Sequence, residues 1–148
     1  MIKKNSESVV AVVPVREGST RINNKNFLSF GEYPTLVHNK IEHLKNAGCF
    51  DHIYLSSDSK KVKDIAVECG VDFLERDSEM CTSKPRWDAV VNHIMETIPG
   101  DPHVAWAMVT SPLFTRYKEA VNEYILNINE FDSLVGVKHV REYLVDER

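Results

Sequence analysis

Apolar runs and polar stretches alternate along the chain in a regular order. Residues 9–13 form a continuous, mostly β-branched run closed by Pro14, a pattern typical of a strand buried on both faces. Apolar residues recurring every three or four positions predict helices over residues 34–47, about 60–69, 87–98 and 117–128. Shorter apolar runs predict further strands over residues 51–56, 71–74, 103–109 and 133–138. The pattern therefore predicts five strands alternating with four helices.

This alternation is typical of βαβ units with right-handed crossovers and a mainly parallel sheet. We therefore expect a three-layer α/β/α, Rossmann-like domain with the first strand near the sheet centre. The length of 148 residues fits one domain, residues 1–148, and the sequence contains no repeat or linker. Polar clusters at residues 14–26, 56–59 and 110–115 follow predicted strands. We expect them at the carboxyl edge of the sheet, where such folds bind ligands.

Composition narrows the classes of function. The net charge of −4 and a pI near 5.9 disfavour nucleic-acid binding. No apolar run approaches the roughly 20 residues of a membrane helix, and residues 9–13 are too short for a signal-peptide core. The three cysteines form no C-x-x-C pair and lack zinc-ligand spacing, which is typical of reduced thiols in a cytoplasmic protein.

The first polar loop, residues 14–26, carries the clearest chemistry. Arg16 and Arg21 offer forked donors for phosphate oxygens, and Lys25 offers a compact positive charge. Backbone N–H groups near Gly18 are suited to anion binding. The loop matches neither the Walker pattern nor G-x-G-x-x-G, which disfavours a P-loop NTPase and a dinucleotide-binding dehydrogenase. These side chains indicate a triphosphate site.

The loop reads P-x-R-x-G-S-x-R-x-x-x-K-N, which resembles the cytidylyltransferases that activate acidic nine-carbon sugars, the CMP-N-acetylneuraminate synthetases and their relatives for other nonulosonic acids. Three further segments resemble the family in the same order. They are Ile53-Tyr54-Leu55-Ser56-Ser57-Asp58, Glu75-Arg76-Asp77 and Thr110-Ser111-Pro112-Leu113. The resemblance extends over about residues 9–138. It implies a nucleotidyltransferase-like version of the expected fold.

The resemblance also implies a reaction. The anomeric hydroxyl of the sugar acid attacks the α-phosphate of CTP, pyrophosphate leaves, and Mg²⁺ holds the phosphates. By position, Arg16 and Lys25 would be the catalytic cations on the triphosphate, and Arg76 would lie near the cytosine. The implied nucleotide-binding set is Arg16, Gly18, Ser19, Arg21, Lys25, Asn26, Arg76, Thr110, Ser111 and Pro112. CTP and an acidic sugar are the expected partners, and the full-length family form is a homodimer.

The sequence also departs from the family pattern. Thr20 replaces the Lys that usually follows Gly-Ser, and Met108, Val109 and Phe114 replace a Gln, a Pro and an Arg around the T-S-P-L segment. The identity of the sugar acceptor and of the metal ligands therefore stays open. Family members are longer, so we expect the sugar-binding, dimerisation and metal-binding parts to lie beyond Arg148, and we expect residues 1–148 alone to bind nucleotide without efficient synthesis.

Two other interpretations compete with this one. A nucleotide-binding remnant would keep the phosphate loop without completing the chemistry, and a transferase for a hexose phosphate would carry a different glycine-rich loop. Among single residues, Asp58 is expected to cap the second helix, Asp88 to be a first-turn acid, and Trp87 to pack in the core. Glu17 is expected to balance Arg16 or Arg21 rather than to hold magnesium.

Overall fold

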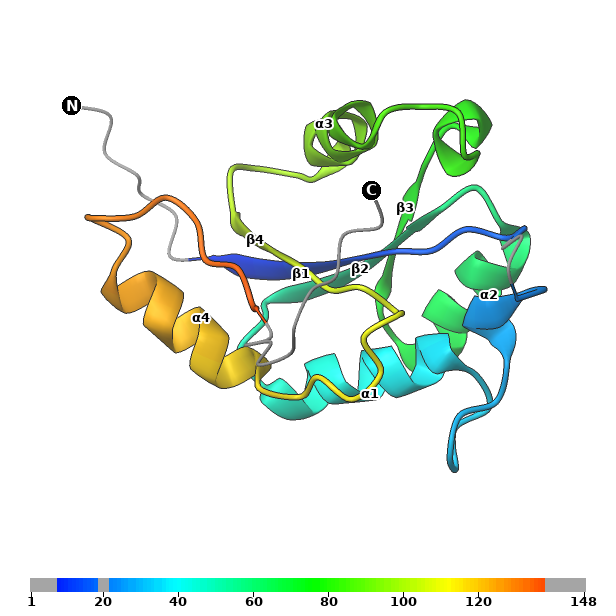
Figure 1. Ribbon diagram of the computed structural model, residues 1–148, viewed down its shortest axis with the longest axis horizontal. Helices are drawn as coiled ribbons and strands as arrows, with labels where there is room; N and C mark the ends of the chain where they lie inside the picture. The colour runs from blue at the N-terminus through cyan, green and yellow to red at the C-terminus, as the bar shows by residue number, and fades with distance from the viewer. Residues whose placement is uncertain (1–7, 19–21, 138–148) are drawn as a thin grey trace, which may run out of the picture.

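The computed structural model describes residues 8–18 and 22–137, and its centre is a parallel sheet (Figure 1). The strands are β1 (Val9–Pro14), β2 (His52–Ser57), β3 (Asp72–Glu75) and β4 (His103–Trp106). They pair in parallel in the order β3-β2-β1-β4. The expected parallel sheet is confirmed, and β1 is an interior strand with β2 and β4 on either side.

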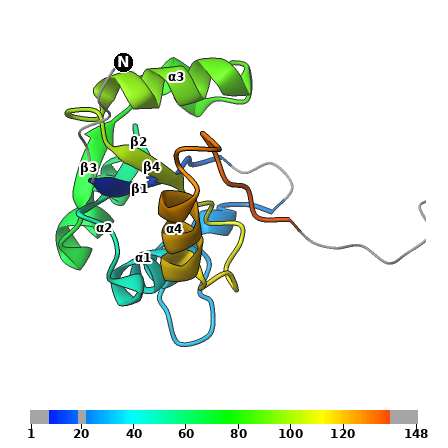
Figure 2. The same cartoon turned by 90° about the vertical axis from the view of Figure 1, so that its left-hand side faces the viewer.

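Helices cover both faces of the sheet (Figures 1 and 2). One face carries α1 (Leu36–Ala47), α2 (Lys60–Cys69) and α4 (Tyr117–Leu126), and the other carries α3 (Trp87–Thr97). Short 3-10 helices span Lys25–Phe27 and Ser78–Cys81. The arrangement is the three-layer α/β/α fold that the alternating pattern predicts. No helix of the described residues is long and apolar enough to cross a membrane.

The side chains of β1 explain why its sequence is continuously apolar. Ala11 and Val13 pack into the core beneath α1 and α2, whereas Val10 and Val12 pack toward α3. All four are at most 2% exposed. Because successive side chains of a strand point to opposite faces, a strand between two helical layers must be apolar at every position.

Helix boundaries follow capping chemistry. Helix α1 begins at Leu36 rather than at Pro34, because the Thr35 hydroxyl accepts a hydrogen bond from the backbone N–H of His38 at 3.2 Å. Helix α2 is capped by Ser59 in the same way, so the expectation that Asp58 is the cap is wrong. The left-handed Gly48 ends α1 as predicted.

Strand β4 ends at Trp106, three residues earlier than predicted, and Pro14 explains why. The backbone N–H of Ala107 donates to the carbonyl of Val12, the last bond between β1 and β4. The next bond of a parallel ladder would come from the N–H of residue 14. Proline has no N–H, so pairing stops there and the chain after Ala107 leaves the sheet.

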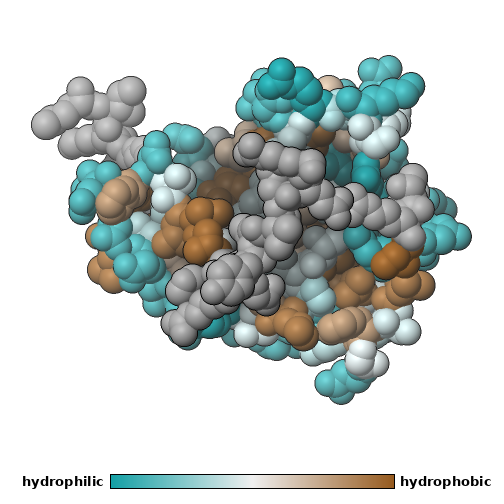
Figure 3. Space-filling view, in the orientation of Figure 1, coloured by the Kyte–Doolittle hydropathy of each residue, from teal (hydrophilic) through white to brown (hydrophobic). Residues whose placement is uncertain are grey.

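The predicted fifth strand is wrong for residues 133–137, and Lys138 lies outside the described residues. Val135 and Val137 are 81% and 85% exposed, and no described strand pairs with the free edge of β4. A strand needs a hydrogen-bonded neighbour and a buried face, so apolar, β-branched composition is insufficient. Figure 3 shows apolar side chains gathered on the side of the molecule where α4 and the following segment lie.

Candidate functional site

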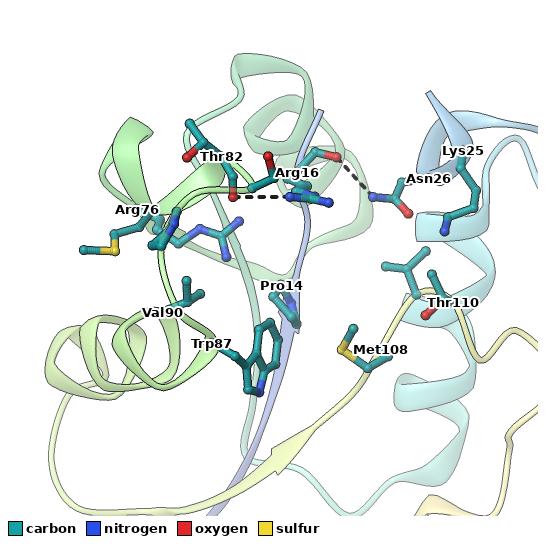
Figure 4. A pocket seen from close by; sticks show the side chains of 14 residues that line it. Pro14, Arg16, Lys25, Asn26, Arg76, Thr82, Trp87, Val90, Met108 and Thr110 are labelled. Atoms are coloured by element: carbon teal, nitrogen blue, oxygen red, sulfur yellow. Dashed lines mark hydrogen bonds between the residues drawn. The ribbon is translucent and has the colours of Figure 1, made fainter. Parts of the chain in front are cut away.

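A cavity of about 370 Å³ opens where β1 and β4 end (Figure 4). Three parts of the chain line it: the end of β1 with the loop that follows, the segment from the end of β3 into the first turn of α3, and the segment after β4. Its lining residues are Pro14, Arg16, Lys25, Asn26, Arg76, Met80, Thr82, Ser83, Pro85, Trp87, Val90, Met108, Val109 and Thr110. Five residues of the predicted nucleotide-binding set, Arg16, Lys25, Asn26, Arg76 and Thr110, are thus together on one cavity.

Arg16 is held at the cavity by both its side chain and its backbone. Its Nη1 donates to the carbonyl of Thr82 at 3.2 Å, and its own carbonyl accepts from the amide Nδ2 of Asn26 at 3.1 Å (Figure 4). The remaining guanidinium donors make no hydrogen bond to described residues and stay available to an anion. The Thr82 contact fixes the direction of the side chain at the cavity wall.

Lys25 and Asn26 reach the cavity through a short 3-10 helix. Asn24 precedes it in the left-handed conformation, with φ of 49°, and turns the chain back toward the sheet edge. Lys25 is half-buried, and Asn26 is 8% exposed. The Oδ1 of Asn26 is buried and accepts no hydrogen bond from the described residues. A buried acceptor without a partner is costly, so Asn26 is prepared to accept from a ligand hydroxyl.

Gly18 adopts a backbone conformation that glycine favours, whereas residues 19–21 of the same loop lie outside the described residues. Gly18 has φ of 77°, a conformation that side chains disfavour, and it lies exposed just beyond Arg16. It does not line the cavity. Ser19 and Arg21 lie outside the described residues, so their predicted contacts stay predictions.

Arg76 lines the cavity although its side chain is largely buried, being 4% exposed. Its Nη2 donates to the carbonyl of Val15 at 2.7 Å, and its Nε donates to Sγ of Cys81 at 3.0 Å. Burial raises the pKa of the Cys81 thiol, while the neighbouring guanidinium opposes that rise. Arg76 therefore binds the loop after β1 to the segment after β3, in addition to lining the cavity.

Only Thr110 of the Thr110-Ser111-Pro112 segment lines the cavity. Ser111 and Pro112 instead direct their carbonyls toward α1, where Lys40 Nζ and Asn39 Nδ2 donate to them at 2.8 and 3.0 Å. The sequence prediction missed both α1 residues, since a polar residue on an amphipathic helix is normally solvent-exposed. Nothing in the sequence alone marks them as buried.

Trp87 forms an apolar wall at the side of the cavity opposite Arg16 and Lys25 (Figure 4). The expectation that it packs in the core is wrong, because it is 55% exposed. The centroids of the Trp87 and Trp106 rings are 5.5 Å apart in an edge-to-face arrangement, and Met108 lies toward the same end of the cavity as Trp87 (Figure 4). Trp87 is the first residue of α3, and its place at the helix start leaves the ring beyond the helical layer. An exposed aromatic wall of this kind suits a flat, weakly polar group.

The second polar cluster supports the first loop without lining the cavity. The Ser59 hydroxyl donates to Oε1 of Glu17 at 2.5 Å. Among the described residues Glu17 therefore pairs with Ser59, and Arg16 donates to Thr82 rather than to Glu17. The alternative balance of Glu17 with Arg21 stays a prediction, because Arg21 lies outside the described residues. Asp88 is paired with Arg86 at 3.2 Å at the start of α3, as a first-turn acid.

The described side chains at the cavity do not form a binding site for a metal ion. Within residues 8–18 and 22–137, no group of three His, Cys, Asp or Glu side chains is placed to hold a metal ion. Magnesium usually needs one or two protein carboxylates when substrate phosphates supply the other ligands. Glu17 is the carboxylate nearest in sequence to the predicted phosphate contacts, and its Oε1 is already used by Ser59. The described residues therefore give no metal ligand set.

The segment between β3 and α3 supplies five of the fourteen lining residues, and the sequence prediction included only Arg76 among them. The residues missed there are Met80, Thr82, Ser83 and Pro85. This segment follows β3 and returns over the carboxyl edge before α3 begins at Trp87. The cluster of turn-forming residues between Thr82 and Pro85 is the signal that marks it as a loop at that edge.

Comparison with known proteins agrees with this geometry. A pseudaminic acid cytidylyltransferase of Campylobacter jejuni is 30% identical over 129 residues, covering 82% of this chain and 55% of that protein. An N-acylneuraminate cytidylyltransferase of Escherichia coli is 30% identical over 131 residues, covering 87% of this chain and 31% of that protein. The chain thus spans about half or less of the length of these relatives.

Solved structures share the fold. A CMP:2-keto-3-deoxy-manno-octonic acid synthetase complexed with CTP matches with a TM-score of 0.68 at 14% identity, over 82% of this chain and 48% of that chain. The bifunctional IspDF of Campylobacter jejuni matches with a TM-score of 0.58 at 20% identity, over 83% of this chain and 31% of that chain. The family model described as cytidylyltransferase matches residues 10–143. With this match over most of its length, the chain belongs to the cytidylyltransferase family.

Proposed function

We propose that this chain provides the nucleotide-binding part of a cytidylyltransferase that joins CTP to an acidic nine-carbon sugar, giving the CMP-sugar and pyrophosphate. N-acetylneuraminate and related nonulosonic acids are the proposed acceptors, in keeping with the names of the relatives at 30% identity. Cytoplasmic location and a homodimer of the complete protein remain predictions that go with this proposal.

The observation that carries the proposal is the division of the cavity into a cationic side and an aromatic side. Arg16 and Lys25 lie on one side, and Trp87 with Met108 lies on the other (Figure 4). A nucleoside triphosphate has the same division, because its phosphates are anionic and its base is flat. The unpartnered Oδ1 of Asn26 lies on the cationic side with Arg16 and Lys25, and it suits a hydroxyl of the nucleotide (Figure 4).

The proposed roles follow from these positions. Arg16 supplies a forked donor to phosphate oxygens from a direction fixed by Thr82, and Lys25 adds a second positive charge. Positive groups set in place before the reaction stabilise the charge that develops on a phosphate as pyrophosphate leaves. Magnesium is proposed to arrive with the triphosphate and to supply further charge neutralisation, with no ligand assigned in this chain.

One observation favours a second candidate, a nucleotide-binding protein that does not complete the transfer. No carboxylate cluster is present at the cavity within the described residues. Nucleotidyl transfer depends on positioning of the phosphates and on stabilisation of their charge. A site without carboxylates to hold the metal ion therefore binds nucleotide without fast chemistry. We therefore expect residues 1–148 alone to bind CTP and to turn it over poorly.

The test is pyrophosphate release measured on the full chain with CTP and Mg²⁺, using N-acetylneuraminate, pseudaminic acid and a hexose 1-phosphate as acceptors. The proposal expects calorimetric CTP binding, with release above background only for the sugar acids. A longer version of the protein, carrying any natural sequence after Arg148, is assayed beside it. Equal turnover by both would contradict the expected weakness of the shorter chain. Absence of CTP binding in both would overturn the nucleotide assignment itself.

A further inference from the structure

Lys40 is a buried lysine in the middle of α1, with a relative exposure of 0%. Its ammonium donates to the Ser111 carbonyl at 2.8 Å, to the Phe114 carbonyl at 3.5 Å and to the Tyr117 hydroxyl at 2.6 Å. The same ammonium lies 5.0 Å from the centre of the Tyr117 ring. All three donors of the side chain are therefore directed at one loop and the start of α4.

No carboxylate of the described residues pairs with Lys40. Its partners are two backbone carbonyls, a phenol and an aromatic face. A buried charge without a counter-ion is costly, and buried lysines are rare for that reason. Burial lowers the pKa of Lys40 to about 8, which reflects that cost. An apolar side chain would fill the same space more cheaply, so packing alone does not account for a lysine here.

Asn39, the preceding residue, adds a second attachment to the same loop. It is 2% exposed, and its Nδ2 donates to the Pro112 carbonyl at 3.0 Å. Together the two α1 side chains bind three carbonyls of the segment 111–114. In Figures 1 and 2 this yellow segment runs beside α1 on its way from β4 to α4.

The loop that is held in this way continues directly from the cavity wall. Met108, Val109 and Thr110 line the cavity, and on one side they are fixed by the Ala107–Val12 bond to the sheet. Within this stretch, the side chain of Val109 is 2% exposed and packs in the core. On the other side, the first hydrogen bond to another element is that of the Ser111 carbonyl with Lys40. Apart from the turn bond from the Ser111 N–H to the Met108 carbonyl, the backbone of these three residues makes no hydrogen bond to described residues.

We propose that Lys40, with Asn39, is a positioning residue that fixes the 108–114 segment against α1 and so sets the shape of the cavity wall that receives the nucleotide. This inference rests on the proposed function for its ligand, but its structural part is independent of it. Lys40 does not touch the cavity and acts only through the loop. Its charge matters because three acceptors, two carbonyls of this segment and the Tyr117 hydroxyl on α4, need a donor with three hydrogens.

The test compares Lys40→Met with Lys45→Met. Lys45 lies on the same helix and donates to the Cys69 carbonyl on the side away from the cavity, so its variant controls for loss of a lysine from α1. Asn39→Ala and Tyr117→Phe each remove one attachment and serve as milder variants if Lys40→Met does not fold. Each variant is examined by backbone amide NMR and by CTP titration.

We expect Lys40→Met to shift the amide signals of residues 108–114 while the β1 and β2 signals stay in place, and to weaken CTP binding about ten-fold. Asn39→Ala is expected to move the same signals less, and Lys45→Met to move neither signals nor affinity. The inference is overturned if Lys40→Met, or the milder variants in its place, keeps wild-type loop signals. If the loop signals move and the wild type itself does not bind CTP, the proposed function fails while the positioning role stands. Moved signals with unchanged CTP affinity would overturn the link between the loop and the nucleotide.

Discussion

Nη2 of Arg76 donates a 2.7 Å hydrogen bond to the carbonyl of Val15, which joins the end of β3 to the loop that follows β1. Val15 is fully buried, so the bond lies inside the protein and not on the cavity surface. It fixes the base of the loop that carries Arg16. The arginine predicted to lie near the cytosine thus has a clear structural role whether or not it also contacts the base.

We expect Arg76→Ala to lower the free energy of unfolding by about 2–3 kcal/mol, the scale of a charged, buried hydrogen bond. Denaturant unfolding followed by circular dichroism measures the change. Arg86→Ala is the control, because the Arg86 side chain is 86% exposed and its pair with Asp88 lies at the surface. Its cost should stay within about 0.5 kcal/mol. Equal stability of Arg76→Ala and the wild type would contradict the buried role.

Arg16→Ala and Lys25→Ala are each expected to weaken CTP binding by about ten- to a hundred-fold, since each removes about 1.5–3 kcal/mol of charged hydrogen bonding. We also expect CTP with Mg²⁺ to bind more tightly than ATP or GTP. Isothermal titration calorimetry measures both. Lys63→Ala on α2, whose ammonium lies 5.8 Å from the Phe73 ring centre, is the control and should bind normally. Normal binding by both cavity variants would contradict the phosphate assignment.

Trp87→Ala is expected to weaken CTP binding about three- to ten-fold, the range of an aromatic contact, while leaving the binding of inorganic tripolyphosphate unchanged. Arg16→Ala should weaken both ligands, because both are polyphosphates. The chain has two tryptophans, so fluorescence of Trp87→Phe isolates Trp106. Quenching by CTP that persists undiminished in Trp87→Phe would show that the base lies elsewhere.

We expect the free energy of unfolding of the wild type, taken relative to that of Lys40→Met, to rise as the pH increases from about 8 to 10.5. Burial lowers the pKa of Lys40 to about 8 from 10.5, so over this window the unfolded lysine holds a proton that the folded one has released. The unfolded state then binds more protons, and the free energy of unfolding rises with pH. His43 on α1 and Tyr117 on α4 are the titrating neighbours.

Comparison between variants is needed because other groups titrate nearby. Burial raises the pKa of Tyr117 to about 12 and that of the three cysteine thiols, which lowers stability at high pH in both proteins. Urea unfolding at pH 7 to 10 gives the difference directly. Lys45→Met should track the wild type across this range. A difference that stays flat would show that Lys40 keeps an ordinary pKa.

The layers of the fold and the position of the site could be predicted from the order of residues along the chain. The unbroken apolar run of β1 requires cover on both faces, and the order of strands and helices requires parallel pairing. Loops after parallel strands meet at one edge, so Arg16, Lys25 and Thr110 were predicted to lie together, and the cavity that they line follows from that topology.

Other features depend on contacts between residues that are distant in sequence. Residues 133–137 have strand-like composition but no described neighbour to pair with, and Pro14 ends β4 through a missing N–H that matters only once the two strands are adjacent. Trp87, which was expected in the core, is 55% exposed, and Lys40, for which the sequence gives no signal, is fully buried. Helical periodicity predicts which side of a helix faces inward. It does not predict whether that side packs against apolar side chains or against a loop whose carbonyls need hydrogen-bond donors. That partner, distant in sequence, sets which side chain is stable there.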